Sequence, residues 1–320
     1  MTRASFGLLF AVALSATPLA AQEFPSRPIR LIVPFAAGGP ADMLARAVAP
    51  AMSATLKQSI VIENRTGAGG VVGVDAVVKA PPDGYTIGVT GPGAVTAAPF
   101  MTTVPYNVQR DLAPIIRIGR IDGVVVANAG LALKSLADLI AYAKANPGKV
   151  NFASAGSGTS IHLAGELLNL ETGIKLIHVP YRGAAPAIND LIGSHVQVMV
   201  PDLSGVLPHI RSGALTALAV TAETRSPAIP DTPTTGEAGF PRVVSESWYG
   251  LIAPAGTPPA VVQKIYDAAR AALQSADVVK QIEAQGATAA PNTPDAFRSL
   301  IDNEQTKWKR VIEATGAKME

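Results

Sequence analysis

The chain has 320 residues, of which 48% are hydrophobic and 16% charged, and its formal net charge is +2. Nucleic-acid phosphates need a concentrated basic surface, so a near-neutral chain with scattered Lys and Arg and few aromatic residues argues against a nucleic-acid partner. The sequence contains no cysteine, which excludes disulfides and a lipid-modified cysteine. Its length suggests two domains, and two domains form a cleft between them.

Residues 1–21 have the pattern of a secretory signal peptide. Arg3 supplies the positive start, residues 6–16 form a short apolar run, and Ala20 and Ala21 are the small residues of a cleavage region. Removal of Arg3 with this segment lowers the net charge to +1. The apolar run is too short to span a bilayer, and no later stretch is long enough. We therefore expect a protein exported to the periplasm and cleaved near Ala20/Ala21.

The first predicted unit is an apolar strand over residues 31–35, a loop of small residues and a helix that Pro40 begins. Proline suits the first position of a helix, and glycine permits the tight turn before it. The free N–H groups and partial positive charge of a helix start attract an anion. An alternative is a plain helix start capped by Asp42. The ligand-binding candidates here are Phe35, Gly38, Gly39, Pro40 and Asp42.

Strands and helices then alternate, which predicts parallel sheets covered on both faces, with a ligand beyond the carboxyl ends of the strands. A strand over residues 85–90 ends in a Gly-Pro-Gly turn and adds the candidates Thr90, Gly91 and Gly93. The glycines of residues 67–73 lack the dinucleotide-binding spacing, because Val72 stands where the third glycine belongs. We predict no cofactor.

The chain is expected to cross between domains near Ile121 and to return after residue 221. The predicted division is residues 22–121 plus 222–320 for a discontinuous first lobe, and residues 122–221 for a second lobe. Further predicted strands cover residues 59–63, 117–128, 151–154, 175–179, 196–200, 217–221 and 249–253, and further helices cover residues 135–146, 161–170, 186–192, 258–274 and 294–314.

A second loop of small polar residues, 154–160, precedes the helix at residue 161 and repeats the strand–loop–helix arrangement of the first predicted unit. Two such loops facing each other would hold a carboxylate from both sides. The ends of two later strands add Tyr181 and Asp202, each with an alternative as packing or capping residue. The candidates of the loop itself are Ser154, Gly156, Ser157, Gly158, Thr159, Ser160 and His162.

Two chemical alternatives remain beside a binding site. A secreted hydrolase of small acids or esters would use Ser157 or Thr159, but no G-x-S-x-G pattern surrounds them, and no His and Asp partners can be assigned. His162 and Glu166 lie one helical turn apart and could share a metal, but a third ligand is missing and the other histidines are scattered. We predict no catalytic residue and no metal, and we expect His162 to hydrogen-bond a neighbouring loop.

Six motifs occur in order along the chain: PSRPIRLIVPFAAGGPAD, VIENRTGAGG, APPDGYTIGV, SAGSGTSIHLAGE, HVPYRGAAPAINDL and WYGLIAPAGTPP. Together they resemble the periplasmic solute receptors of the tripartite tricarboxylate transporter family, often called Bug receptors after the Bordetella uptake genes. The resemblance covers essentially the whole chain after the signal peptide. It departs from the family pattern at Ala37, at Gln197 and at Pro201-Asp202, where the family usually has Pro, an acidic residue and Asp-Asn.

The resemblance implies an α/β, two-lobed periplasmic-binding-protein fold (type II, Venus-flytrap) with parallel-sheet lobes, a ligand cleft between them, no cofactor and no catalysis. It also implies that residues 35–42 and 154–162 hold a ligand carboxylate, partly through water. The expected partners are a small carboxylate (di- or tricarboxylate, aromatic acid or acidic amino acid) and membrane permease subunits, and we expect a monomer. A periplasmic sensor that docks on a signalling partner is a further alternative.

Overall fold

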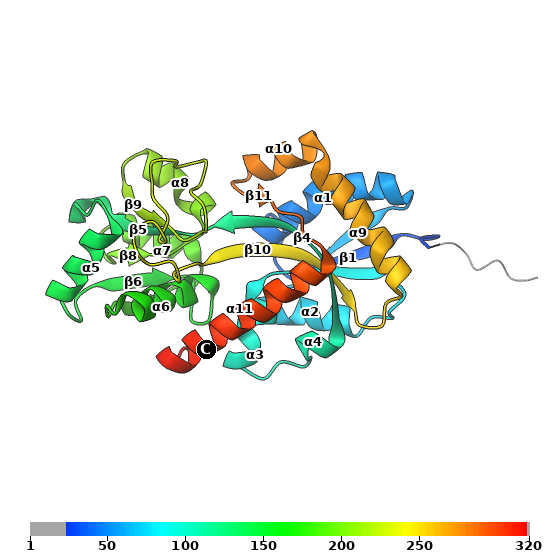
Figure 1. Ribbon diagram of the computed structural model, residues 1–320, viewed down its shortest axis with the longest axis horizontal. Helices are drawn as coiled ribbons and strands as arrows, with labels where there is room; N and C mark the ends of the chain where they lie inside the picture. The colour runs from blue at the N-terminus through cyan, green and yellow to red at the C-terminus, as the bar shows by residue number, and fades with distance from the viewer. Residues whose placement is uncertain (1–23, 319–320) are drawn as a thin grey trace, which may run out of the picture.

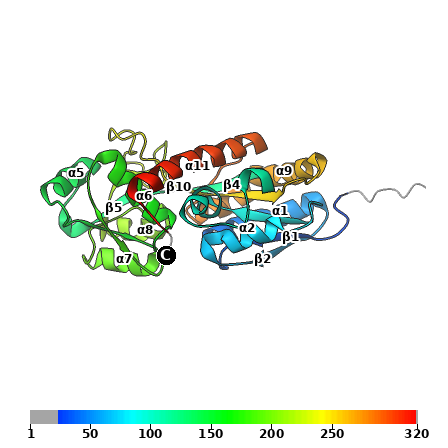
Figure 2. The ribbon, with the colours of Figure 1, turned by 90° about the horizontal axis from the view of Figure 1, so that it is seen from below.

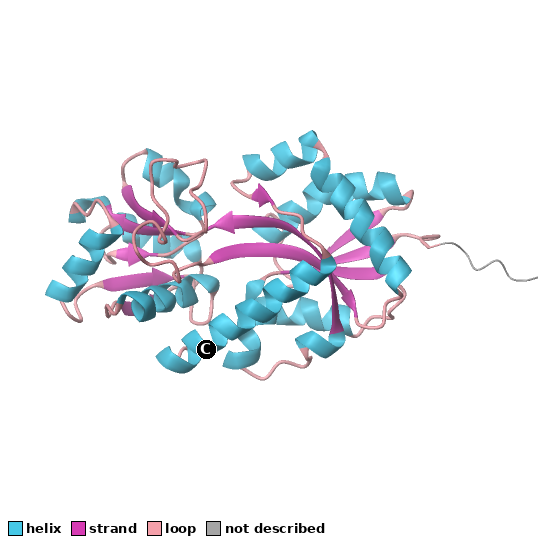
Figure 3. Cartoon of the chain, viewed as in Figure 1, coloured by secondary structure: helices cyan, strands magenta, loops and turns pink. Residues whose placement is uncertain are grey.

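The structure, a computed structural model, describes residues 24–318, so the predicted signal peptide lies outside the described residues. Two sheets lie side by side along the long axis of the molecule, each covered by helices (Figure 1). Two long strands, β4 (Leu112–Asp122) and β10 (Glu246–Pro254), run from one group of elements toward the other (Figure 3). No helix in residues 24–318 has the length and apolar character needed to cross a bilayer.

The six-stranded sheet has the order β11-β4-β10-β3-β1-β2. Its strands β2, β1 and β3 are parallel, as predicted, whereas β10 runs antiparallel to β3 and β4, and β11 runs antiparallel to β4. The antiparallel pair arises because the chain leaves this sheet along β4 and returns to it along β10. The other strands are β1 (Ile29–Val33), β2 (Ile60–Asn64), β3 (Thr86–Thr90) and β11 (Thr288–Ala289).

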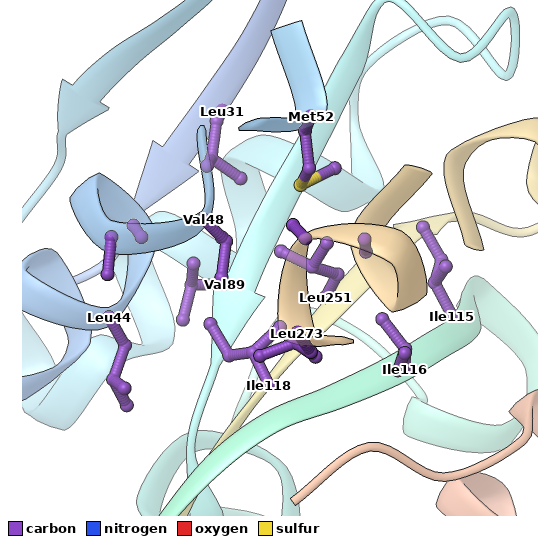
Figure 4. Close-up of a cluster of buried hydrophobic side chains, with 14 of the residues drawn as sticks. Leu31, Leu44, Val48, Met52, Val89, Ile115, Ile116, Ile118, Leu251 and Leu273 are labelled. Atoms are coloured by element: carbon purple, nitrogen blue, oxygen red, sulfur yellow. The ribbon is translucent and has the colours of Figure 1, made fainter. Parts of the chain in front are cut away.

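Successive side chains of each strand point to opposite faces, so this sheet has one hydrophobic core on each face. Leu31 packs with side chains of α1 (Pro40–Leu56), α9 (Pro259–Gln274) and α10 (Ala276–Ala284), whereas the adjacent Ile32 packs with α2 (Val71–Val78) and α11 (Pro294–Thr315). Figure 4 shows the first core, in which Leu44, Val48 and Met52 of α1 meet Val89 and Leu251 of the sheet. Each such buried side chain contributes about 1.5–3 kcal/mol to stability.

The five-stranded sheet has the order β7-β6-β8-β5-β9. Here β6 is parallel to β7 and β8, and β5 is antiparallel to β8 and β9. The strands are β5 (Val124–Asn128), β6 (Asn151–Ser154), β7 (Ile177–Pro180), β8 (Val198–Met199) and β9 (Leu215–Val220). The covering helices are α5 (Leu136–Ala145), α6 (Ser160–Thr172), α7 (Ala184–Ile192) and α8 (Leu203–Arg211).

Helix α11 connects the two groups of elements. Its last turns reach α6, as Figures 1 and 2 show. There Trp308 and Val311 are buried together with Leu163 and Leu167 of α6. The short helices of the chain are η1 (Ala68–Gly70), η2 (Gly93–Ala97), α3 (Ala98–Met101), α4 (Val108–Asp111) and η3 (Ala129–Leu131).

The strand-like stretch predicted over residues 117–128 is extended, but it forms two strands, β4 and β5, which meet at Gly123 and belong to different sheets. A Cβ atom at Gly123 would lie 2.4 Å from Oγ1 of Thr221, so only glycine fits at this break. Helices α8 and α10 were not predicted, and the strand predicted over residues 196–200 is reduced to Val198–Met199.

Candidate functional site

A pocket of about 330 Å³ lies between the two sheets, a volume suited to a small molecule. It is lined by the ends of β1 and β3, by the loop and first turn of α6, and by one face of β10. The predicted residues that line it are Phe35, Gly91, Gly93, Ser157, Gly158, Thr159 and Ser160. The lining residues that were not predicted are Ala68, Gly69, Pro92, Ala98, Ala155, Ile161, Ser247 and Tyr249.

The loop before α6 is held in shape by its own hydrogen bonds. The N–H of Gly156 donates to Oγ of Ser154 at 3.1 Å, and the N–H of Gly158 donates to Nδ1 of His162 at 3.0 Å. Thr159 caps the helix, since its Oγ1 accepts from the N–H of His162. Both glycines have positive φ, +127° and +81°, which L side chains rarely adopt. This confirms the prediction that His162 hydrogen-bonds the neighbouring loop.

Three other N–H groups of this segment are unpaired. Within the described part of the chain, the N–H groups of Ser157, Ser160 and Ile161 have no acceptor, and all three residues line the pocket. Ser160 and Ile161 are the first two residues of α6, where a helix leaves its N–H groups unpaired and carries partial positive charge. This arrangement suits an anion such as a carboxylate.

The loop before α1 is organised differently. Asp42, which is 1% exposed, accepts hydrogen bonds from Arg46 at 2.8 Å, from the N–H of Gly38 at 2.9 Å and from Asn64 at 2.9 Å. These donors, Arg46 first, lower the pKa of Asp42 to about 2 against the effect of burial. The carboxylate therefore stabilises the start of the helix, as the capping alternative expected. Of the residues predicted in this loop, the pocket lining includes Phe35 and omits Gly38, Gly39, Pro40 and Asp42.

Strand β10 closes the pocket on another side. Its Tyr249 meets Phe35 edge to face, with ring centroids 6.4 Å apart and an angle of 89°. Its Ser247 donates a hydrogen bond to Oδ1 of Asp202 at 2.7 Å, and burial raises the pKa of Asp202 to about 6. Burial, with Asp202 as a second cause, also raises the pKa of Tyr249. The alternation of strand side chains, with Ser247 and Tyr249 on one face, was the signal available in the sequence.

The remaining predicted residues lie outside the pocket lining. Thr90 is buried, the hydroxyl of Tyr181 donates to Asp190 at 2.7 Å, and Asp202 hydrogen-bonds the pocket residue Ser247 without lining the pocket itself. Ser154 and Gly156 lie behind the loop that they shape, as does His162. In this conformation these residues therefore support the segments that line the pocket and do not line it themselves.

A pair of histidines lies directly behind the loop before α6. The rings of His162 and His178 stack with centroids 3.9 Å apart, and Nε2 of His178 is 2.6 Å from Oγ of Ser154. Burial lowers the pKa of His178 to about 4. The sequence spacing does not indicate this pairing, which arises because β7 lies next to β6. Within residues 24–318, no group of three or more His, Asp or Glu side chains could hold a metal ion.

Comparison with known proteins relates this chain to a known family. A model described as "Tripartite tricarboxylate transporter family receptor" matches residues 44–317. The chain is 42% identical to Protein BugT of Bordetella pertussis, with 100% of this chain and 99% of that protein covered. A Rhodopseudomonas palustris protein solved with adipate has a TM-score of 0.79 at 33% identity, over 93% of this chain and 100% of the other. MatC from the same organism, solved with bound malate, has a TM-score of 0.75 at 32% identity, over 90% and 100%. These matches confirm the predicted family resemblance and the two-sheet α/β periplasmic-binding-protein fold.

Proposed function

Because this chain belongs to the tripartite tricarboxylate transporter receptor family, which comprises periplasmic solute-binding proteins and not enzymes, we propose that it binds a small organic acid by its carboxylate in the pocket between its two sheets. The observation that carries this proposal is the set of free N–H groups at Ser157, Ser160 and Ile161. These residues line a cavity whose lining contains no charged side chain, so backbone donors provide the positive potential.

Two relatives support a carboxylate ligand. One was solved with adipate and another with malate, and both ligands carry carboxylates. A hydrogen bond from an N–H group to a charged carboxylate contributes about 1.5–3 kcal/mol, and a helix N-terminus adds up to about 1 kcal/mol. After the costs of desolvation and ordering, such contacts are consistent with about −8 kcal/mol, which is a micromolar Kd.

The proposed site consists of the pocket-lining residues together with the supporting residues of the loop before α6. Gly38, Gly39 and Pro40 remain candidates for contact with the acid in a closed form, since Gly38 and Pro40 are exposed and Gly39 is half-buried in this structure. The proposed closure would turn the two lobes, divided near residues 121/122 and 221/222, about the strand break at Gly123. The closed protein would then deliver the acid to membrane permease subunits.

Thermal shift followed by calorimetry on matched acids and amides tests the proposal. Adipate, malate, benzoate and glutamate are compared with the corresponding uncharged amides. A binding acid at a hundredfold excess over its Kd adds about 2.7 kcal/mol to stability, and the ligand is recovered unchanged. The amides leave the melting temperature unaltered because they lack the anion. Equal stabilisation by acids and amides, or by no acid in a panel of mono-, di- and tricarboxylates, would contradict the proposal.

Delivery is tested separately. Once an acid is identified, its uptake is measured in cells with and without the receptor gene, and in cells carrying a Ser160→Pro variant. We expect uptake at micromolar acid to require the intact receptor. Uptake that persists without the receptor would contradict a role in transport.

A further inference from the structure

One wall of the pocket presents hydrogen-bond acceptors. The hydroxyl of Ser247, which lines the pocket, donates its single proton to Oδ1 of Asp202 at 2.7 Å. A serine hydroxyl has one proton and two lone pairs, so Ser247 can only accept from any further partner. The hydroxyl of Tyr249 hydrogen-bonds that of Ser247, so Tyr249 directs its own proton at Ser247 and one lone pair of Ser247 stays open. The β10 wall of the pocket is therefore suited to a ligand group that donates.

The carboxylate behind Ser247 has no cation beside it. Within residues 24–318, Ser247 is the only side chain that hydrogen-bonds Asp202, and no Lys or Arg forms an ion pair with it. Burial raises the pKa of Asp202 to about 6, which still leaves it mostly ionised at neutral pH. An uncompensated negative charge in a partly desolvated place makes the β10 wall of the pocket electronegative.

The two arginines that pair with Glu246, the residue before Ser247, lie on the other face of β10. Arg117 and Arg120 of β4 lie 3.2 and 2.9 Å from the carboxylate of Glu246 on β10. Successive residues of a strand point to opposite faces, so Glu246 and Trp248 lie on one face of β10, and Ser247 and Tyr249 on the other. The cores agree, because Trp248 packs in the cluster with Phe297 and Tyr249 in the cluster with Leu251.

We infer that this pocket prefers a monocarboxylate whose far end carries a hydrogen-bond donor, a hydroxyl or an ammonium group, over a dicarboxylate of the same length. The inference rests on the proposed function, because the free N–H groups of α6 hold the one carboxylate. A second carboxylate that reaches the β10 wall would meet the lone pairs of Ser247 and the charge of Asp202. The lining also contains Phe35, Pro92 and Tyr249, which suit a hydrocarbon or aromatic body. Asp202 acts through Ser247, as a positioning residue for specificity.

Two matched sets of acids test this preference by calorimetry at pH 7.5. One set is hexanoate, 6-hydroxyhexanoate, 6-aminohexanoate and adipate. The other is benzoate, 4-hydroxybenzoate, 4-(aminomethyl)benzoate and terephthalate. In each set that binds, we expect the hydroxyl or ammonium member to bind about tenfold more tightly than the dicarboxylate. The two donor members distinguish a neutral from a cationic ligand end.

Variants of Asp202 and Ser247 test whether the β10 wall causes this ligand preference. Asp202→Asn removes the charge and keeps an oxygen that accepts from Ser247. The ratio of the Kd of the dicarboxylate to the Kd of the donor acid, called the gap below, should therefore fall at least about fivefold. Ser247→Ala should narrow it as well, and it carries the test if Asp202→Asn lowers the melting temperature. Asp190→Asn is the matched control, since this carboxylate accepts from Tyr181 outside the pocket and its loss should leave the gap unchanged.

The outcomes are separable. Tightest binding by the dicarboxylate in every binding set, or a gap that neither Asp202→Asn nor Ser247→Ala changes, would overturn the inference and leave the proposed function intact. Failure of all eight acids, including the simple monocarboxylates, would count against the proposed function itself and overturn the inference with it.

Discussion

The segments before α1 and α6 are both strand–loop–helix turns rich in small residues, yet they contribute unequally to the pocket. The segment before α6 provides Ala155 and residues 157–161, whereas the segment before α1 provides only Phe35. In α1 the first residue is Pro40, which has no N–H, and Asp42 takes the N–H of Gly38. In α6 the first residue is Ser160, whose N–H is free. A helix start is thus a candidate anion site only where its N–H groups are unused and its residues line a cavity.

The sharpest way to break this comparison is to remove one N–H from α6. Thr159 has φ −72° and ψ 160°, a conformation that a residue before proline accepts, so Ser160→Pro is compatible with the helix start. Loss of one bond to a charged group should weaken acid binding about 10- to 100-fold, measured by calorimetry.

Two controls accompany that variant. Ser160→Ala loses the hydroxyl but keeps the N–H, and Pro40→Ala gives the first residue of α1 the N–H that it lacks. Both should bind acid nearly as the parent protein does. Equal affinities of Ser160→Pro and Ser160→Ala would show that this N–H does not hold the ligand.

The second test concerns stability at α1. Asp42→Ala removes the acceptor of Arg46, Asn64 and the N–H of Gly38, so we expect the free energy of unfolding to fall by about 1–3 kcal/mol. Acid affinity should change less than threefold, since Asp42 does not line the pocket. Denaturant unfolding and calorimetry check the two quantities. A large loss of affinity with unchanged stability would reverse the roles assigned to the two loops.

The same carboxylate predicts a pH dependence. The pKa of Asp42 is lowered in the folded protein to about 2 from the ordinary 3.8. Its contribution is therefore complete above about pH 4 and is lost as the pH falls from about 4 to about 2. The difference in unfolding free energy between the parent and Asp42→Asn should shrink over that window. A difference that stays constant down to pH 2 would contradict the assignment.

A smaller effect is expected behind the loop before α6. His162→Asn retains an acceptor near the position of Nδ1, whereas His162→Gln places its polar group one bond further out. The N–H of Gly158 loses its acceptor only in the second variant. We expect His162→Gln to bind acid about fivefold more weakly and His162→Asn to stay near the parent, since one hydrogen bond contributes about 1 kcal/mol. Equal losses in both variants would point to the ring stacking with His178 instead.

The smallest predicted effect tests the one pocket contact of the loop before α1. Phe35→Leu keeps an apolar side chain but removes the edge-to-face contact with Tyr249. Aromatic pairs contribute about 0.5–1.5 kcal/mol beyond burial, and only part of that loss reaches the ligand, so acid affinity should fall about two- to fivefold. A change as large as that of Ser160→Pro would show that the two loops contribute equally after all.

Local rules predicted much of this molecule. Pro40 and Thr159 mark the starts of α1 and α6, because a proline at the first helical position and a capping hydroxyl act within one turn. The same rules could not show which N–H groups of each loop are paired within the protein and which are left unpaired. Asp42 is occupied by Asn64, a residue that reaches it only because β2 lies beside β1.

The sequence by itself determined the alternation of strands and helices, the glycine-rich loops and the family resemblance, since each depends on residues that are neighbours along the chain. The tertiary structure decided which loop faces the pocket and what closes it. Ser247 and Tyr249 reach the pocket because β10 inserts between β3 and β4, and Asp202 meets Ser247 across 45 positions of sequence. Contacts of that range depend on strand order and on which face a side chain occupies, and both are set by the packing of the whole chain.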